Sequence, residues 1–334
     1  MIEGILADLA DQDYPSDHLE VHVVADRCTD STAERAGRLA VVHDRASGEE
    51  TKGAAIGWLV GRMTIGSSDI VVIFDADGRV GSDVIAALSD GADSGFRAMQ
   101  VYLDTPNPDE SYVALAGALS QWMSNRLIDL PRRNLGMSCS LLGTGFALVG
   151  DLTRKLEDTG LGMTEDQALS DRFAIEGEQV IWLHHVHVLD EKPATIDVLT
   201  RQRARWAQGR ALGRRRSLRA LLFDDGSWSL SRLDRIVRLI LPGRTISATI
   251  LAGIAAAAFM WPSVLVFSPF VIIGLLTIAV SLSVAALLAE GAGTARVAKI
   301  PIIGLFALLW IPERILARRD RSWYHTPHEG AGGG

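Results

Sequence analysis

Two carboxylates interrupt an otherwise apolar stretch of the sequence at residues 71–78, Val-Val-Ile-Phe-Asp-Ala-Asp-Gly. Asp75 and Asp77 follow a run that is typical of a buried strand, and a glycine that favours a turn comes next. In open parallel sheets, ligands bind beyond the carboxyl ends of the strands. Two neighbouring carboxylates repel each other unless a cation lies between or beside them. Mg²⁺ or Mn²⁺ prefers such oxygen ligands and shares its shell with substrate phosphates, so the pair predicts a metal–diphosphate site.

An Asp-x-Asp pair alone does not specify a metal site, because such pairs are also common in surface turns. Other residues that could take part in chemistry occur later in the chain. Glu165 and Asp166 open a predicted helix at 164–177, where an acidic residue also serves as a helix cap or dipole partner. A later helix carries three polar or aromatic side chains within one turn: Gln202, Arg205 and Trp206. Taken alone, that helix is a basic segment beside a membrane.

Strands and helices alternate along the first 200 residues. The predicted strands cover 19–25, 41–45, 69–77, 97–103, 138–150 and 178–191. The predicted helices cover 30–40, 52–63, 83–92, 110–129 and 164–177. This alternation favours an α/β domain with a mainly parallel sheet. Such a sheet would place the Asp75–Asp77 pair at its carboxyl edge.

Charge is distributed unevenly along the chain, whose formal net charge is −7. Residues 1–200 carry 15 Lys and Arg against 33 Asp and Glu, whereas residues 201–244 carry 12 Arg against 3 Asp. A basic belt of this kind suits nucleic acid, anionic lipid or phosphate. The next 45 residues, 245–289, contain no charged side chain. We therefore expect the belt to face lipid, and we expect no nucleic-acid partner.

The uncharged stretch 245–289 predicts two transmembrane helices joined near Trp261-Pro262, since one crossing needs about 20 apolar residues. A buried soluble hairpin is the alternative. The shorter apolar run 300–312 predicts an interfacial or re-entrant helix. With two crossings, all the basic clusters that flank these runs fall on one side, which is the cytoplasmic side. We expect a multi-pass protein of the inner cell membrane with a cytoplasmic catalytic domain.

Taken in order, these motifs resemble glycosyltransferase family 2, and most of all its membrane-integrated branch with the cellulose, chitin, hyaluronan and poly-N-acetylglucosamine synthases. The matching segments are QDYP (12–15), VVADRCTDSTAERA (23–36), KGAAI (52–56), VVIFDADGRV (71–80), LGTGFALV (142–149), TEDQALSDRF (164–173), QRARW (202–206) and WYHTPHE (323–329). Each segment is weak alone, but their order is specific. The resemblance implies a GT-A fold and inverting transfer of a sugar from a nucleotide-diphosphate donor, usually a UDP-sugar.

The resemblance also implies which residues bind the donor. Asp26 would contact the nucleoside, and Asp75 would lie near the ribose and diphosphate. Asp77 would bind the divalent metal, Mg²⁺ or Mn²⁺, on the diphosphate. Lys52 would lie near the donor phosphates.

The remaining roles concern the transfer step and the acceptor. Asp166 would be the general base, and Glu165 would support it. The three residues of the later helix would hold the diphosphate and line the acceptor site: Gln202, Arg205 and Trp206. Gly143 and Gly145 allow either close approach of an acceptor chain or a simple tight turn.

The motifs divide the chain into four parts. We expect a GT-A domain at 1–215, a basic juxtamembrane segment at 216–244, two transmembrane helices at 245–289, and an interfacial helix with a cytoplasmic tail at 290–334. The sequence begins after the first strand of the family and without the N-terminal transmembrane helix of this branch. A late start codon or a fragment would explain this, and a missing central strand would expose sheet edges.

Three functions remain open. The first is transfer of a sugar to a glycan in cell-envelope or exopolysaccharide synthesis. The second keeps the fold but glycosylates a lipid, such as a polyprenyl phosphate or diacylglycerol. The third is a truncated, catalytically silent subunit of a synthase complex. A soluble nucleotidyltransferase is disfavoured by the uncharged stretch at 245–289.

Overall fold

The computed structural model describes residues 2–157, 164–241 and 268–303, with isolated positions between 250 and 260. The strands are β1 (His22–Asp26), β2 (Val41–Arg45), β3 (Ile70–Ile73), β4 (Arg79–Val80), β5 (Ala98–Asp104), β6 (Phe146–Val149) and β7 (Val180–Leu189). The helices of the first 200 residues are α1 (Ile2–Ala10), α2 (Thr32–Ala36), α3 (Lys52–Val60), α4 (Val84–Asp93), α5 (Tyr112–Ser124), α6 (Leu130–Asn134), α7 (Glu165–Glu176) and the start of α8 (Ile196–Phe223). Short 3₁₀ or π segments cover Ser16–His18, Asn125–Asp129 and Gly150–Glu157.

The C-terminal part continues with α9 (Leu230–Ile240), α11 (Pro269–Ala289), α12 (Thr294–Val297) and α13 (Ile300–Ile303). Helix α8 runs without interruption across residue 215, where the end of the catalytic domain is predicted. That domain boundary stays a prediction. Side-chain hydroxyls cap the first turns of four helices, at Thr51, Ser111, Thr195 and Ser229. These caps bond amide groups that a helix start leaves without partners.

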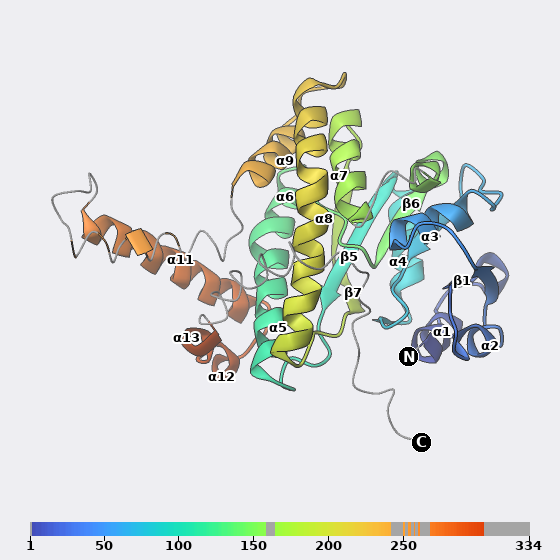
Figure 1. The fold of residues 1–334 in the computed structure, drawn as a ribbon, viewed down its shortest axis with the longest axis horizontal. Helices are drawn as coiled ribbons and strands as arrows, with labels where there is room; N and C mark the ends of the chain where they lie inside the picture. The colour runs from blue at the N-terminus through green and yellow to red at the C-terminus, as the bar shows by residue number, and fades with distance from the viewer. Residues whose placement is uncertain are drawn as a thin grey trace.

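The main sheet is mixed, so the expectation of a mainly parallel sheet is wrong. Its strand order is β3-β6-β5-β7-β4, and β5–β7 is its parallel pair. The β3–β6, β5–β6 and β4–β7 pairs are antiparallel. β1 and β2 form a separate two-stranded parallel sheet (Figure 1). That the chain lacks the first strand of the family fold stays a prediction.

The path of the chain between β5 and β6 explains the antiparallel pairs. The helical segment 112–134 is about 34 Å long at 1.5 Å per residue, so it carries the chain back past the start of β5. An extended segment then returns toward the carboxyl edge, since Cys139 N donates to Val180 O while Gly145 N donates to Ile73 O. β6 starts at that edge and must run the opposite way. The alternation of strands and helices in the sequence does not reveal that the chain passes along the sheet a second time before β6.

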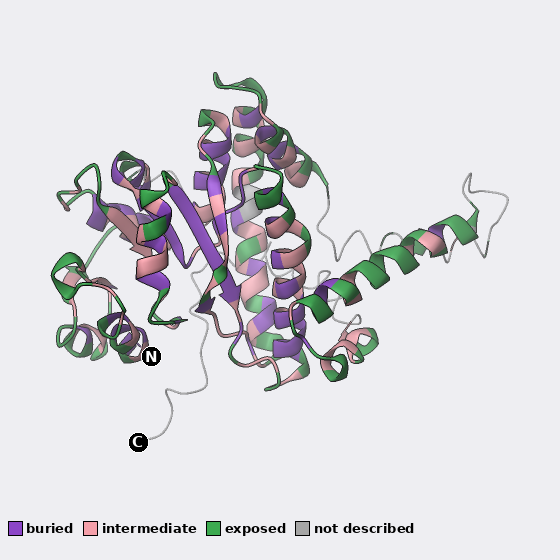
Figure 2. Cartoon of the chain, turned by 180° about the vertical axis from the view of Figure 1, so that it is seen from behind, coloured by how far each residue is buried: buried purple, intermediate pink, exposed green. Residues whose placement is uncertain are grey.

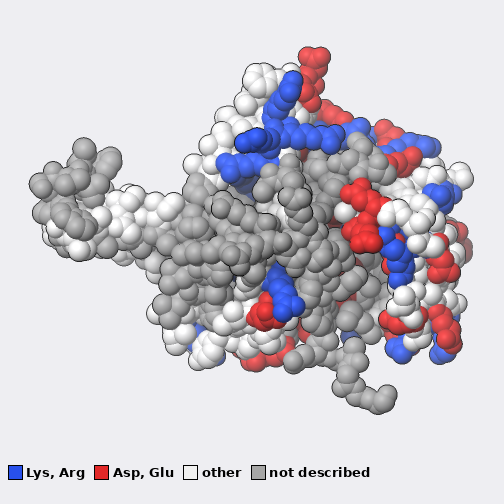
Figure 3. Space-filling model, in the orientation of Figure 1, with Lys and Arg blue, Asp and Glu red and all other residues white. Residues whose placement is uncertain are grey.

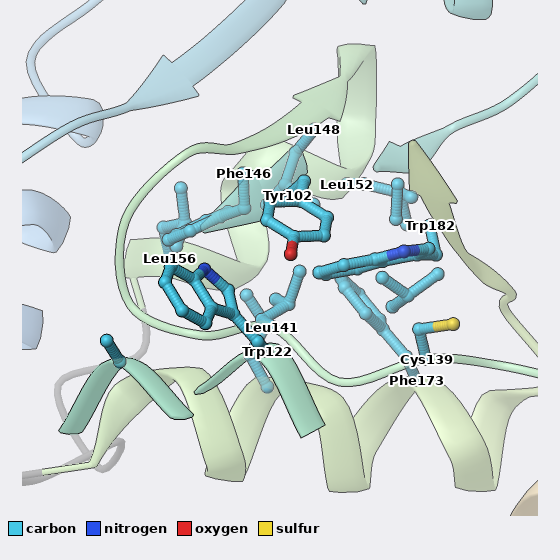
Figure 4. Packing of buried hydrophobic residues seen from close by; sticks show 14 of the residues in the cluster. Tyr102, Trp122, Cys139, Leu141, Phe146, Leu148, Leu152, Leu156, Phe173 and Trp182 are labelled. Atoms are coloured by element: carbon cyan, nitrogen blue, oxygen red, sulfur yellow. The ribbon is translucent and has the colours of Figure 1, made fainter. Parts of the chain in front are cut away.

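Apolar side chains fill both faces of the main sheet, because successive strand residues point to opposite sides. Tyr102 of β5 packs with Trp122, Phe173 and Trp182 on the side of α5 and α7 (Figure 4). Met99 of β5 belongs to a second cluster on the opposite face. That cluster takes its other side chains mainly from α1 and α4. The central strands are accordingly buried between helices (Figure 2).

The predicted membrane segments are described only in part. Phe270–Ala289, within α11, is long and apolar enough to cross a membrane, and 17% of its most apolar window is buried. Figure 1 shows α11 projecting away from the sheet and its covering helices. The first predicted crossing, the turn at Trp261-Pro262 and the segment 323–329 lie outside the described residues, as does most of the run 300–312.

Gly145 sets the sharp reversal before β6, and we predict that Gly145→Ala destabilises the fold. Its φ is +62°, and a Cβ there would lie 2.6 Å from Val101 Cγ2. We expect a loss of about 1–3 kcal/mol, measured as a lower midpoint of denaturant unfolding.

The matched control for this prediction is Gly213→Ala in α8, where an added Cβ meets no described atom within 4 Å. There the change should be neutral or stabilising by up to about 1 kcal/mol. Equal effects of the two substitutions would contradict the importance of the turn.

Candidate active site

Asp75 and Asp77 lie in a tight turn directly after β3. Gly78 N donates to Asp75 O at 3.1 Å, which closes the turn. β3 ends at Ile73, so strand spacing does not determine the directions of the two carboxylates. Asp77 nevertheless acts on Asp75 electrostatically: burial raises the pKa of Asp75, Lys52 opposes that shift, and Asp77 adds to it.

Lys52 connects three segments at this edge of the sheet. It is the first residue of α3, whose start is fixed by the Thr51 cap. Its Nζ donates to Asp75 Oδ1 and, at 2.7 Å, to Gly143 O. Burial lowers the pKa of Lys52, but Asp75, Glu165 and Asp166 outweigh burial and raise it. The ammonium is thus charged at neutral pH and surrounded by carboxylates.

Glu165 and Asp166 begin α7 and form an acid pair, in which Glu165 is buried and Asp166 is half-buried. Burial raises the pKa of Glu165 to about 7, with Lys52 opposing and Asp166 adding to the shift. Burial also raises the pKa of Asp166, although Gln167 N donates to its Oδ1 at 2.8 Å. The side chain of Thr164 makes no capping bond.

Helix α8 contributes a cation, Arg205, near these carboxylates. Burial lowers the pKa of Arg205, while Asp75 and Glu165 raise it, so its guanidinium lies within electrostatic reach of both carboxylates. Gln202 is half-buried on the same turn of α8. Trp206 keeps 41% of its surface exposed, so its ring is accessible to a ligand.

Six of the nine predicted site residues therefore come together: Lys52, Asp75, Asp77, Glu165, Asp166 and Arg205. Asp26 is different, since it ends β1 in the separate two-stranded sheet. Its two oxygens accept from Arg45 Nη1 at 2.7 Å and from Arg27 Nη2 at 2.9 Å. A nucleoside contact by Asp26 must share or replace these ion pairs, and it stays a prediction.

Three site residues were missed from sequence. Thr144 Oγ1 accepts from Asp75 N at 3.0 Å and fixes the turn. Gln167 donates to Asp166. The charge of Asp190, directly after β7, raises the pKa of Asp75. The position of Asp190 beyond a strand end is the signal that could have found it; the other two contacts depend on tertiary packing.

Comparison with protein-family models assigns the chain to a family. Residues 1–209 match the family model described as "Glycosyltransferase like family 2". The match covers more than half of the chain, which therefore belongs to this family. The narrower branch of polysaccharide synthases stays a prediction.

Two curated relatives carry the name beta-monoglucosyldiacylglycerol synthase. The protein from Nostoc sp. (strain PCC 7120) is 27% identical over 222 residues, which are 63% of this chain and 46% of the relative. The protein from Trichormus variabilis is 26% identical over the same shares. The chain thus spans about half the length of the curated relatives it matches.

A solved structure shares the fold. It is a mannosyltransferase from Pyrobaculum calidifontis in complex with GDP-Man and Mn²⁺. The TM-score is 0.56 and the identity is 21%, over 94% of this chain and 83% of the other. The similarity supports the predicted GT-A-like α/β fold.

We predict that Glu165 makes stability fall as pH rises. Its pKa is raised from 4.5 to about 7 in the folded protein, so the folded state holds the proton more tightly. The resulting stability is fully present below pH 4.5 and is lost as pH rises through about 7, by at most about 3 kcal/mol. In Glu165→Gln the unfolding midpoint should change less between pH 5 and 8.

The control for this pH dependence is Glu34→Gln, at an exposed position of α2. It should keep the pH dependence of the unmodified protein. Parallel pH curves for Glu165→Gln and the unmodified chain would show that the carboxyl titrates normally.

Proposed function

We propose that this protein transfers a sugar from a nucleotide-diphosphate donor to a lipid at a membrane. One observation carries the proposal: Lys52, Asp75 and Arg205 lie beside the Glu165–Asp166 pair, at the carboxyl edge of the sheet. Cations suit a diphosphate, and a carboxylate with a raised pKa suits proton abstraction near neutral pH.

The donor half of the site is built for a charged leaving group. Lys52 and Arg205 are placed to bind diphosphate oxygens, and Asp77 is placed to hold Mg²⁺ or Mn²⁺. Lys52 already bonds Asp75, which leaves Asp77 as the main predicted ligand. No group of three or more His, Cys, Asp or Glu in the described ranges forms a ready metal site. The donor's phosphates would therefore complete the shell, as is usual for Mg²⁺, and the bound metal would offset charge on the leaving diphosphate.

The proposed transfer step uses the donor-binding residues together with the Glu165–Asp166 pair. The acceptor hydroxyl gives its proton to Asp166, with Glu165 beside it. The acceptor oxygen bonds the anomeric carbon as the bond from that carbon to the diphosphate breaks, and the nucleoside diphosphate leaves. Attack opposite the leaving group inverts the anomeric centre. The donor is a UDP-sugar or a GDP-sugar, since the structural relative is in complex with GDP-Man.

A lipid acceptor is supported by the relatives and by α11. Both curated relatives are named for synthesis of a glucosyldiacylglycerol. Helix α11 has 21 residues, which span about 31 Å and match the hydrocarbon thickness of a bilayer. Its apolar side chains are exposed, for example Phe270 at 75% and Ile278 at 57%. A second crossing within 245–268 stays part of the proposal.

Helix α9 adds a surface that fits a membrane boundary. It turns its arginines inward: Arg232 is 1% exposed and caps carbonyls at the end of α8, and Arg235 pairs with Asp171 of α7. Leu230 and Leu233 point outward and are 68% and 50% exposed. Exposed arginines of α8 gather beside it (Figure 3). Apolar side chains next to arginines favour an anionic lipid surface.

A glycan acceptor is the second candidate. The observation that favours it is the placement of Gln202, Arg205 and Trp206 on one turn of α8, with the ring of Trp206 accessible. An aromatic face suits a sugar ring. The relatives' names favour the lipid.

The test measures nucleoside diphosphate release from membranes that contain the full chain. UDP-glucose, UDP-N-acetylglucosamine and GDP-mannose are supplied in turn with Mg²⁺ or Mn²⁺. We expect release with one donor, a loss of about 10²–10⁴-fold in Asp166→Asn, and weak donor binding in Asp77→Ala.

Asp93→Asn is the matched control, because Asp93 is exposed at the end of α4. It should keep full release. Unchanged release in Asp166→Asn would refute the proposed base. Absence of nucleotide binding in the unmodified chain would move the silent-subunit hypothesis to the front.

A further inference from the structure

Arg235 is a buried arginine that joins α9 to the start of α7. Its side chain lies inside the contact of α9 with α7, and the residue is 4% exposed (Figure 1). Nε and Nη2 both donate to Asp171 Oδ1, from Nε at 2.7 Å. Nη2 also donates to Gln167 O at 3.1 Å, and Nη1 donates to Ser140 Oγ at 3.0 Å. One guanidinium thus binds two turns of α7 and the segment that leads to β6.

The first turn of α7 depends on contacts of this kind, because it lacks a side-chain cap. Thr164 precedes the helix and makes no capping bond, whereas hydroxyls cap α3, α5, α8 and α9. Ser170 Oγ donates to Asp166 O at 2.7 Å, and Arg235 binds the next carbonyl, that of Gln167. The placement of Asp166 is therefore fixed by residues outside the first turn.

The fork of Arg235 supplies direction more than stability. A buried ion pair adds little net stability over a well-packed apolar pair, because both charges lose their water. A guanidinium nevertheless fixes the relative orientation of its acceptors, since its N–H groups form a rigid plane. Ser140, one of these acceptors, lies shortly before Gly143, whose carbonyl accepts from Lys52 at 2.7 Å. Arg235 thus ties the first turn of α7 to the segment that also holds Lys52.

Arg235 also acts on the charge of Asp166. Burial raises the pKa of Asp166, whereas hydrogen bonds within α7 and the charges of Lys52 and Arg235 oppose that rise. Glu165 lies directly beside it on α7, and Arg205 of α8 acts on Glu165. A general base must be ionised before it can accept a proton, so Arg235 favours the form of Asp166 that can do so.

We propose that Arg235 is a positioning residue for sugar transfer, which holds the first turn of α7 so that Asp166 meets the acceptor hydroxyl. It acts through Asp166 and does not touch the substrate. The inference rests on the proposed function, in which Asp166 is the base. It also links that base to α9, whose outward leucines form the proposed membrane surface.

The test is a double substitution, Arg235→Gln with Asp171→Asn, because loss of Arg235 alone would leave a buried carboxylate without its partner. Release of nucleoside diphosphate is measured on membranes that contain the full chain, with UDP-glucose, UDP-N-acetylglucosamine and GDP-mannose in turn. We expect kcat to fall about 10-fold to 100-fold, since a misplacement of about 1 Å can cost about 100-fold. The KM for the donor should stay within twofold, because Lys52 and Arg205 are unchanged.

The pH profile separates positioning from an effect on folding alone. Loss of Arg235 raises the pKa of Asp166, so the acidic limb of kcat should move to higher pH in the double variant. Arg235→Lys keeps the charge but loses the planar fork. Its acidic limb should stay in place, while kcat falls about threefold to tenfold.

The matched control is Arg132→Gln with Asp234→Asn, an ion pair that joins α9 to α6 rather than to α7. Arg132 Nε donates to Asp234 Oδ2 at 3.0 Å, and Arg132 is 8% exposed. This control should lower the unfolding midpoint but keep kcat within twofold and leave the acidic limb in place.

The outcomes separate this inference from the proposed function. Absence of release by the unmodified chain with all three donors would overturn the proposed function, and this inference with it. Release by the unmodified chain, with unchanged kcat and pH profile in the Arg235 double variant, would overturn the role of Arg235 alone. An equal loss of kcat in the control pair would overturn it as well.

Discussion

The ion pair between Lys52 and Asp75 is the contact on which the rest of the site depends. It joins the start of α3 to the turn after β3, and the bond from Lys52 to Gly143 O adds the segment before β6. The half-buried ammonium of Lys52 is stabilised by nearby carboxylates, which are those of Asp75, Glu165 and Asp166. Loss of Lys52 would leave these three carboxylates with Arg205 as the nearby cation, so we expect folding to depend on Lys52.

The site brings cations, which suit a diphosphate, close to carboxylates, which suit proton abstraction. Glu165 and Asp166 start α7, and burial raises the pKa of both carboxyls, to about 7 for Glu165. Arg205 lies within electrostatic reach of these carboxylates from α8, which packs against α9. A diphosphate placed among Lys52, Arg205 and Asp77 would therefore lie beside the groups that take the acceptor proton.

Local patterns predicted the elements well, because hydrophobic spacing and caps act over a few residues. The prediction of β2 at 41–45 matches its observed bounds, and the motif residues meet at one edge as parallel strand ends require. Strand direction in β6 was not predictable, because it depends on a return path fixed by Gly145. The contact between β5 and the residue after α11 was equally hidden, since the Tyr102–Glu290 hydrogen bond joins residues 188 positions apart.

The central claim is that the acid pair and the basic residues of this site move a sugar onto a neutral lipid. The most direct measurement is mass spectrometry of lipids extracted after incubation of the purified chain with isotope-labelled UDP-glucose or GDP-mannose in nanodiscs containing diacylglycerol. The account predicts labelled hexose on a neutral glycerolipid in the unmodified chain, and none in Asp166→Asn. Label found only in a polymer, only on a lipid phosphate, or equally in both proteins would contradict it.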